Sequence, residues 1–297
     1  MADRPAPAPA ATSVPSVDER VAAYSTNVLP SDYTFDPNLS LDENYLVLTL
    51  IYARLSMSKR GNMACIIVDP TRSSVNEEEP VEPPAKRPRT ASPSSPRRDS
   101  SAFHSYPGHI LSHSNNFPQP TSLPSEASQP KLPPKKNRTA ATLKPSQSLF
   151  QAKASSFPEL HAEARSICLA ASSGVPLAGS TAYVSFPPCQ ACLPLLVASG
   201  VKRLVYRQTM PSQGGVELCK REGVECVEFV EKEKDEELKR RAGEWWKARG
   251  EDKEVTRARL ERWWKEQERV VMGELAESAV GLEGEKEEVL EGVEAAS

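Results

Sequence analysis

Two long stretches rich in proline and serine divide this chain and limit how much of it can fold. Residues 71–107 carry almost no aliphatic side chains, so they cannot bury enough apolar surface to offset the entropy lost on ordering, and residues 119–156 form a second polar, proline-rich stretch. The first 40 residues, rich in Ala, Pro and Ser, also lack an apolar period. We therefore predict a disordered arm over residues 1–40 and one domain over 41–230 that carries two disordered inserts. A charged tail over 231–297 is predicted to be helical and then disordered.

The segments between these stretches alternate between helical and strand patterns. "SLDENYLVLTLIYARL" places apolar residues at helical spacing after a start at Ser40 or Asp42, and "MACIIVDP" reads as a central strand covered on both faces. "GHILSH" begins a second strand, which we expect to run antiparallel to the first. A long insert between the two strands is tolerable because the entropy cost of closing a loop grows only slowly with its length. The later elements are the helix "ELHAEARSICLAASSG", the strand "STAYVSF", a helix over 190–199, the strand "VKRLVY", the helix "GGVELCKREG" and the strand "VECVEF".

A strand, a crossover helix and a further strand form a right-handed parallel unit in nearly all known sheets. The last three strands are therefore expected to run parallel. The pattern predicts an α/β protein with three α/β/α layers around a mixed five-stranded sheet.

Composition and targeting signals narrow the class further. The start, "MADRPAPAPAATSVPS", has no apolar core flanked by basic residues, and the longest apolar run, residues 45–55, is too short to cross a bilayer. We predict a soluble protein of the cytosol or nucleus, with no membrane partner. Residues 86–89, in "PPAKRPRT", fit either a nuclear import signal or a solvated basic linker. The net charge of -3 combines a basic middle with an acidic tail, so it leaves a nucleic-acid partner open.

One histidine and a Cys-x-x-Cys pair form the strongest chemical signal. His161, Cys189 and Cys192 are imidazole and thiolate donors of the kind that tetrahedral Zn²⁺ takes, and three protein ligands leave one position open. Both cysteines lie at a predicted helix start, where free N–H groups and the helix dipole favour thiolates. Six cysteines are too few for a disulfide scaffold in such a chain. We predict a zinc site.

Glu163 is the candidate proton carrier of that site. It follows His161 by two residues at the start of a helix, close enough to reach a water at the open position without binding the metal. Zinc lowers the pKa of a bound water toward neutrality, and a carboxylate can move the proton.

H-A-E, then 24 residues, then P-C-x-x-C resembles the signature of the zinc-dependent cytidine and deoxycytidylate deaminase superfamily, and within it the deoxycytidylate (dCMP) deaminase branch. "ENYLVLTLIYARLSMSKRGNMACIIV", "ILSHSNNFP" and "GVKRLVYRQ" with "CKREGVECVEF" resemble further segments of that branch. The resemblance covers about residues 41–69, 108–118 and 157–229.

This resemblance implies a hydrolase that converts dCMP to dUMP and releases ammonia. His161, Cys189 and Cys192 would bind zinc and Glu163 would shuttle protons. The implied substrate contacts are Asn116 to the sugar hydroxyl, the Ala162 backbone to the pyrimidine, and Ser185 to Pro188 beside the zinc. The resemblance also implies a homo-oligomer or pairing with another deaminase chain.

Some features depart from the family or have simpler explanations. Arg165 stands where many relatives have a smaller polar residue. Asn115 and Asn116 also suit a turn, and the zinc could be purely structural. Lys59, Arg60 and Arg207 could contact a phosphate or be ordinary loop cations. The remaining assignments are solvated loop positions for His104, His109 and His113, and core faces for Cys65, Cys168, Cys219 and Cys226.

The tail carries two Trp pairs, in "EWWK" and "RWWK". They share one face if the helix is continuous, although Gly243 and Gly250 make continuity doubtful. Burial against their own domain is favoured over a partner site.

Two alternative functions remain open from the sequence. The chain could be a deaminase subunit acting on tRNA or another polynucleotide, whose phosphates the basic inserts would track. It could also be an inactive, zinc-stabilised subunit that pairs with an active partner.

Overall fold

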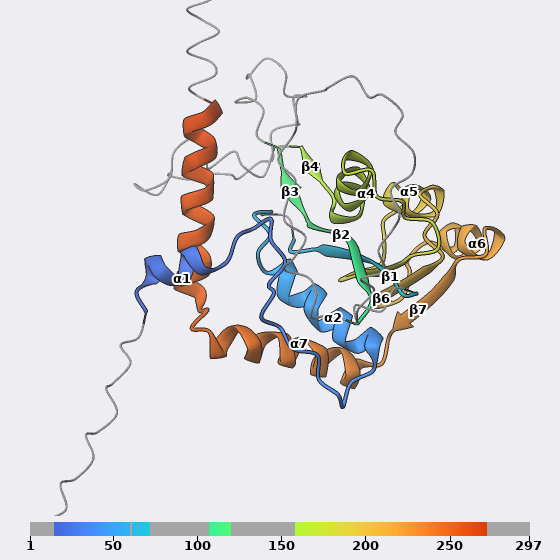
Figure 1. The fold of residues 1–297 in the computed structure, drawn as a ribbon, viewed down its shortest axis with the longest axis horizontal. Helices are drawn as coiled ribbons and strands as arrows, with labels where there is room; N and C mark the ends of the chain where they lie inside the picture. Colours follow the sequence, from blue (N-terminus) through green and yellow to red (C-terminus); the bar gives the residue numbers. More distant parts are fainter. Residues whose placement is uncertain (1–14, 60, 72–106, 120–157, 272–297) are drawn as a thin grey trace, which may run out of the picture.

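The computed structural model describes residues 15–59, 61–71, 107–119 and 158–271 (Figure 1). The two predicted inserts lie almost entirely outside the described residues, as do the basic segment 86–89, Arg60, His104 and the end of the tail. No helix in the described part is both long and apolar enough to cross a membrane. The location in the cytosol or nucleus stays a prediction.

The centre of the molecule is a five-stranded sheet of order β2-β1-β5-β6-β7. β1 (Ala64–Asp69) runs antiparallel to both β2 (His109–Asn115) and β5 (Thr181–Val184). β6 (Arg203–Arg207) and β7 (Glu225–Phe229) continue parallel to β5. The mixed sheet and its parallel last strands confirm the prediction from the crossover helices.

Helices cover both faces of the sheet, which gives the predicted three layers. Ile66 and Val68 of β1 point into a core shared with α2 (Leu41–Ala53) and α7 (Lys232–Ala248). Cys65 and Ile67 point into a second core. The helices on that second face are α4 (Ala162–Ser172), α5 (Cys192–Ala198) and α6 (Gln213–Arg221). β1 is buried on both faces because successive side chains of a strand alternate in direction.

The start of α2 follows from local sequence. The Ser40 hydroxyl accepts the N–H of Glu43 at 3.3 Å, and the Glu43 carboxylate accepts the N–H of Ser40 at 2.8 Å. This reciprocal capping box satisfies two N–H groups that the first helical turn leaves free. Of the two predicted starts, Ser40 and Asp42, the structure has Ser40 as the N-cap.

The predicted tail helix is a structural part of the domain. Trp246 of α7 is 1% exposed, and its indole N–H donates to the Ile51 carbonyl of α2 at 3.1 Å. The helix ends just before Gly250, whose φ is +70°, and a further helix runs over residues 253–271. The two Trp pairs therefore lie on separate helices. Trp264 is also 1% exposed, whereas Trp245 and Trp263 are partly buried, so full burial holds for one Trp of each pair.

The prediction of a disordered arm over residues 1–40 is wrong for residues 15–40. Helix α1 (Val17–Ala23) opens this segment, and Leu29, 1% exposed, lies in the core. The Tyr33 hydroxyl donates to the Asn44 side chain of α2 at 3.1 Å. A few isolated apolar residues anchor the segment, and they produce no periodic signal. We call residues 15–39 the N-terminal segment.

Two side-chain predictions also need correction. Cys168 is exposed, because the buried face of α4 consists of Ala162, Glu163, Ser166 and Ala170. His113 lies on β2, half-buried, with its ring edge-on to that of Tyr52 at 5.3 Å. Cys65 and Cys219 are buried as predicted, Cys226 is partly buried at the edge strand, and His109 is exposed.

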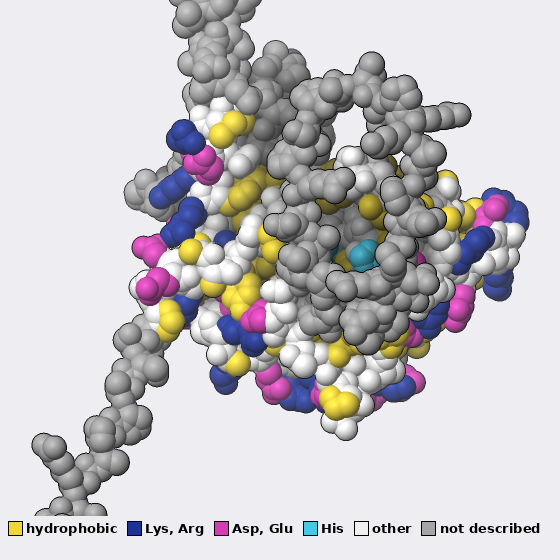
Figure 2. Space-filling model, in the orientation of Figure 1, with side chains coloured by type: hydrophobic (Ala, Val, Ile, Leu, Met, Phe, Trp, Pro, Cys, Tyr) yellow, Lys and Arg dark blue, Asp and Glu magenta, His cyan; other side chains and the backbone are white. Residues whose placement is uncertain are grey.

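Figure 2 shows basic and acidic side chains interspersed along the edge formed by α6 and β7. Neither sign of charge gathers there.

Candidate metal centre and active site

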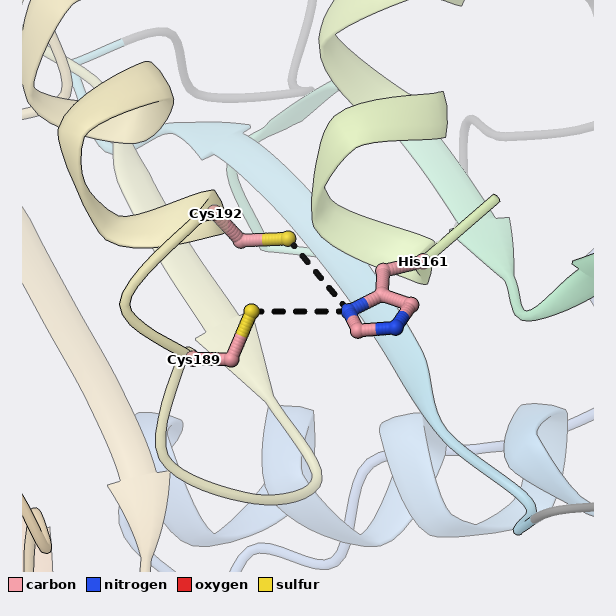
Figure 3. A group of neighbouring side chains, drawn as sticks. All are labelled: His161, Cys189 and Cys192. Carbon is pink, nitrogen blue, oxygen red and sulfur yellow. Dashed lines mark hydrogen bonds between the residues drawn. The ribbon is translucent and has the colours of Figure 1, made fainter. Parts of the chain in front are cut away.

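The predicted ligands meet where two helices begin on the same face of the sheet (Figure 3). β4 (Glu159–Leu160) pairs with β3 (Phe117–Pro118) and delivers His161 as the N-cap of α4. Cys189 lies in the turn after β5, and its carbonyl accepts the N–H of Cys192 at 3.1 Å.

The spacing of these donors suits a tetrahedral zinc ion. His161 Nδ1 lies 3.5 Å from the Cys189 sulfur and 3.6 Å from the Cys192 sulfur. With Zn–S bonds of about 2.3 Å and Zn–N bonds of about 2.0–2.1 Å, a tetrahedral ion separates its sulfur and nitrogen ligands by about 3.6 Å. In the described part of the chain this is the group of side chains that could hold a metal.

The state of the Cys192 thiol is set by burial. Burial, followed by the nearby charge of Glu163, raises the pKa of Cys192 well above its usual range. A bound cation would favour the thiolate and so couple metal binding to loss of a proton.

Glu163 occupies the first turn of α4 and is fully buried. Neither carboxylate oxygen has a hydrogen-bond partner among the described residues. Burial raises the pKa of Glu163, against smaller opposing influences of the nearby Glu163 backbone N–H, the charge of His161 and the Cys192 thiol. A buried carboxylate without partners is costly for folding alone, so its position beside the metal ligands points to a role in chemistry.

Asn116 and Ala162 are in contact. The Asn116 side-chain oxygen accepts the N–H of Ala162 at 3.2 Å, and its side-chain nitrogen donates weakly to the Gly61 carbonyl at 3.4 Å. Asn116 is 3% exposed, and its backbone carbonyl accepts a hydrogen bond from the Ser56 hydroxyl at 2.9 Å. The predicted substrate asparagine is therefore held against the start of α4.

Ser185 and Pro188 lie in the turn that carries the cysteines. The Ser185 hydroxyl accepts the N–H of Ala64 at 3.0 Å and ties this turn to β1. Pro188 is buried and lines a cavity of about 290 Å³ between α5 and α6, together with Leu193 and Met210.

Arg207 is not a loop cation. It is 1% exposed, and its guanidinium pairs with Asp235 of α7 and donates to the Ser185 carbonyl at 3.3 Å. Lys59 is exposed, and its amine lies 5.2 Å from the ring centroid of Trp264. Neither alternative left open for Arg207, a phosphate contact or an exposed loop cation, fits its burial and its ion pair, which give it a structural role.

Sequence reasoning missed the contacts made by Arg165. Its guanidinium donates to the Asn27 side-chain oxygen at 2.8 Å and lies 4.2 Å from the Phe117 ring centroid. The one signal in the sequence was that Arg165 is larger than the polar residue that many relatives have at this position, and is charged.

Residues 40–208 match the family model described as "Cytidine and deoxycytidylate deaminase zinc-binding region". The chain belongs to this family, and the metal ion that it binds is zinc. The His161, Cys189 and Cys192 group fits that ion.

Two phage proteins show the similarity in particular. The chain is 35% identical over 80 residues to the deoxycytidylate deaminase of Enterobacteria phage T4, covering 26% of this chain and 42% of that protein. It is 44% identical over 55 residues to the deoxycytidylate deaminase of Enterobacteria phage T2, covering 18% and 29%. The chain thus spans less than half the length of these relatives.

The solved structures to which the chain is similar include dCMP deaminase from the cyanophage S-TIM5 in complex with dCMP and dUMP. The identity is 18% and the TM-score 0.36, over 65% of this chain and 98% of that one. A deaminase/reductase from Thermotoga maritima matches at 16% identity and a TM-score of 0.35, over 68% and 39%.

Proposed function

We propose that this protein catalyses the hydrolytic deamination of a cytosine nucleotide, with dCMP as substrate and dUMP and ammonia as products. The observation that carries the proposal is the carboxylate of Glu163, which is buried beside three zinc-type donors and has no hydrogen-bond partner in the part of the chain that the structure describes. Family membership and the phage deoxycytidylate deaminases support the substrate class.

His161, Cys189 and Cys192 would hold the zinc ion, which when bound supplies a water of lowered pKa. The Glu163 carboxylate would take a proton from the attacking water and pass it to the ring nitrogen beside the amine-bearing carbon, while the water oxygen bonds to that carbon. It would then carry the second proton of the water to the amine as the C–N bond breaks, so that the products are the uracil ring and ammonia. The raised pKa of Glu163 suits this role because a carrier works best when both of its protonation states are accessible.

The substrate contacts form part of the proposal. Since the Asn116 oxygen already accepts the N–H of Ala162, its weakly bonded side-chain nitrogen is the atom left to donate to a sugar hydroxyl. The Ala162 backbone would bind the pyrimidine. Ser185 and Pro188 would shape the pocket from the cysteine turn, with Ser185 acting through backbone position because its hydroxyl is engaged.

The test is ammonia release from cytidine, deoxycytidine, CMP, dCMP and adenosine by zinc-loaded protein. Glu163→Gln preserves shape but cannot move the proton, so turnover of dCMP should fall by about 10²–10⁴-fold with zinc content unchanged. Glu217→Gln, at an exposed position of α6, is the matched control.

An active Glu163→Gln variant would overturn the assignment. Silence of the wild-type protein on the whole panel, with zinc bound, would favour a polynucleotide substrate or an inactive subunit. An oligomer stays a prediction from the family resemblance.

A further inference from the structure

Arg165 joins the zinc-bearing helix to a segment far away in the sequence. It lies one turn into α4, two residues after Glu163, and is half-buried. Its guanidinium donates to Asn27 at 2.8 Å and to the Asn115 side chain at 3.4 Å, and it stacks on the Phe117 ring. One side chain therefore contacts both the N-terminal segment and the chain around Asn116.

The same two regions are tied together a second time. The buried Asn115 side chain donates its N–H to the Thr26 carbonyl at 2.8 Å. An amide with no exposed surface is held in one orientation when both of its ends are bonded. The N-terminal segment is thus part of the support of residues 115–117.

A further support comes from the C-terminal side. The Phe117 ring lies edge-on to Trp263 of the helix over 253–271, with centroids 5.4 Å apart. That helix and α1 are linked in turn, since Arg20 pairs with Asp252 at 3.2 Å and Arg262 pairs with Asp18. Figure 1 shows α1 beside this helix. Both supports lie outside residues 40–208, the part that matches the family model.

Residues 115–117 contact the chain on both sides of the candidate zinc ligand His161. Asn116 accepts the N–H of Ala162, and Phe117 pairs with Leu160 between β3 and β4, just before His161. Any shift of residues 115–117 would therefore move the Asn116 side chain, the candidate sugar contact, and would also disturb the start of α4.

We propose that Arg165 is a positioning residue that couples the N-terminal segment to Asn116, and so sets how tightly the substrate is held. This rests on the proposed function. Arg165 acts through Asn115 and Phe117, so its loss should weaken substrate binding while the zinc and Glu163 continue to work.

The first experiment compares KM and kcat for dCMP in Arg165→Leu and Asn27→Ala with two exposed controls, Arg221→Leu and Ser31→Ala. Loss of one or two hydrogen bonds should raise KM about three- to tenfold in both test variants. We expect kcat to stay within about twofold and zinc content to be unchanged. Arg165→Lys keeps the cation over Phe117 but not the planar fork, so its KM should be intermediate.

Hydrogen exchange of peptides covering residues 15–39 and 109–119 separates this proposal from the proposed function. Arg165→Leu should speed exchange in both peptides, and Asn27→Ala should speed it in 109–119. If the wild-type protein deaminates no nucleotide, the proposed function fails and exchange in 109–119 alone decides the coupling. Unchanged exchange there, or an unchanged KM in an active protein, overturns the proposal.

Discussion

At the scale of single residues, the Arg207–Asp235 pair shows how burial changes the role of a charge. The Arg207 side chain is 2% exposed and lies 5.3 Å from the Phe186 ring, next to Ser185 in the cysteine turn. Burial alone would raise the pKa of Asp235, but hydrogen bonds from Arg207 and Lys239 hold it below its usual value. Asp235 is therefore ionised at neutral pH, and its ion pair with Arg207 ties the cysteine turn to α7.

Asp235→Asn should destabilise the protein by about 3 kcal/mol in urea unfolding, because it leaves a buried guanidinium without a countercharge. Glu244→Gln removes an ion pair with Arg240 on the same helix, where both side chains are more than half exposed. It should cost less than about 1 kcal/mol. If the two variants lost the same free energy of unfolding, the buried Arg207–Asp235 pair would contribute no more to stability than the exposed pair.

At the scale of elements, two glycines of similar sequence context behave differently. Gly243 lies inside α7, with open space where a Cβ would stand. Gly250 follows the C-cap of α7 at φ +70°, and a Cβ there would meet the Arg20 side chain at 3.0 Å. The turn at Gly250 lets the helix over 253–271 leave α7 and carry Trp264 into its own buried contact.

Gly243→Ala should stabilise the protein by up to about 1 kcal/mol, since alanine is the better helix former. Gly250→Ala should destabilise it by about 1–2 kcal/mol because of the left-handed backbone. Thermal unfolding of the two variants side by side gives the comparison. A stabilising Gly250→Ala would contradict the proposed turn.

At the scale of the whole molecule, the candidate metal site joins parts of the chain that no strand pairing connects among the described residues. His161 is the N-cap residue of α4, Cys189 lies in the turn before α5, and Cys192 is the first residue of α5. A metal that binds only the folded protein lowers the free energy of that state.

Chelation should therefore lower the unfolding midpoint by about 5–10 °C if zinc is near a hundredfold excess over its dissociation constant, and zinc should restore it. Cys192→Ser should remove this response. The exposed thiol variant Cys168→Ser should keep it. A chelator effect that survives in Cys192→Ser would place the stabilising metal elsewhere.

Local information in the sequence was enough for the sheet and for a helix start at Ser40 or Asp42, and it singled out His161, Cys189 and Cys192, which the structure brings together. Strand and helix periods are properties of neighbouring residues, and the H-A-E and P-C-x-x-C spacings belong to the starts of two helices. Tertiary structure alone decided that Leu29 and Tyr33 anchor the N-terminal segment and that α7 covers the sheet. It also decided that Arg207 is buried and that Arg165 reaches Asn27. These contacts join residues far apart in the chain, and their energy depends on the partner that folding brings near, which no local period records.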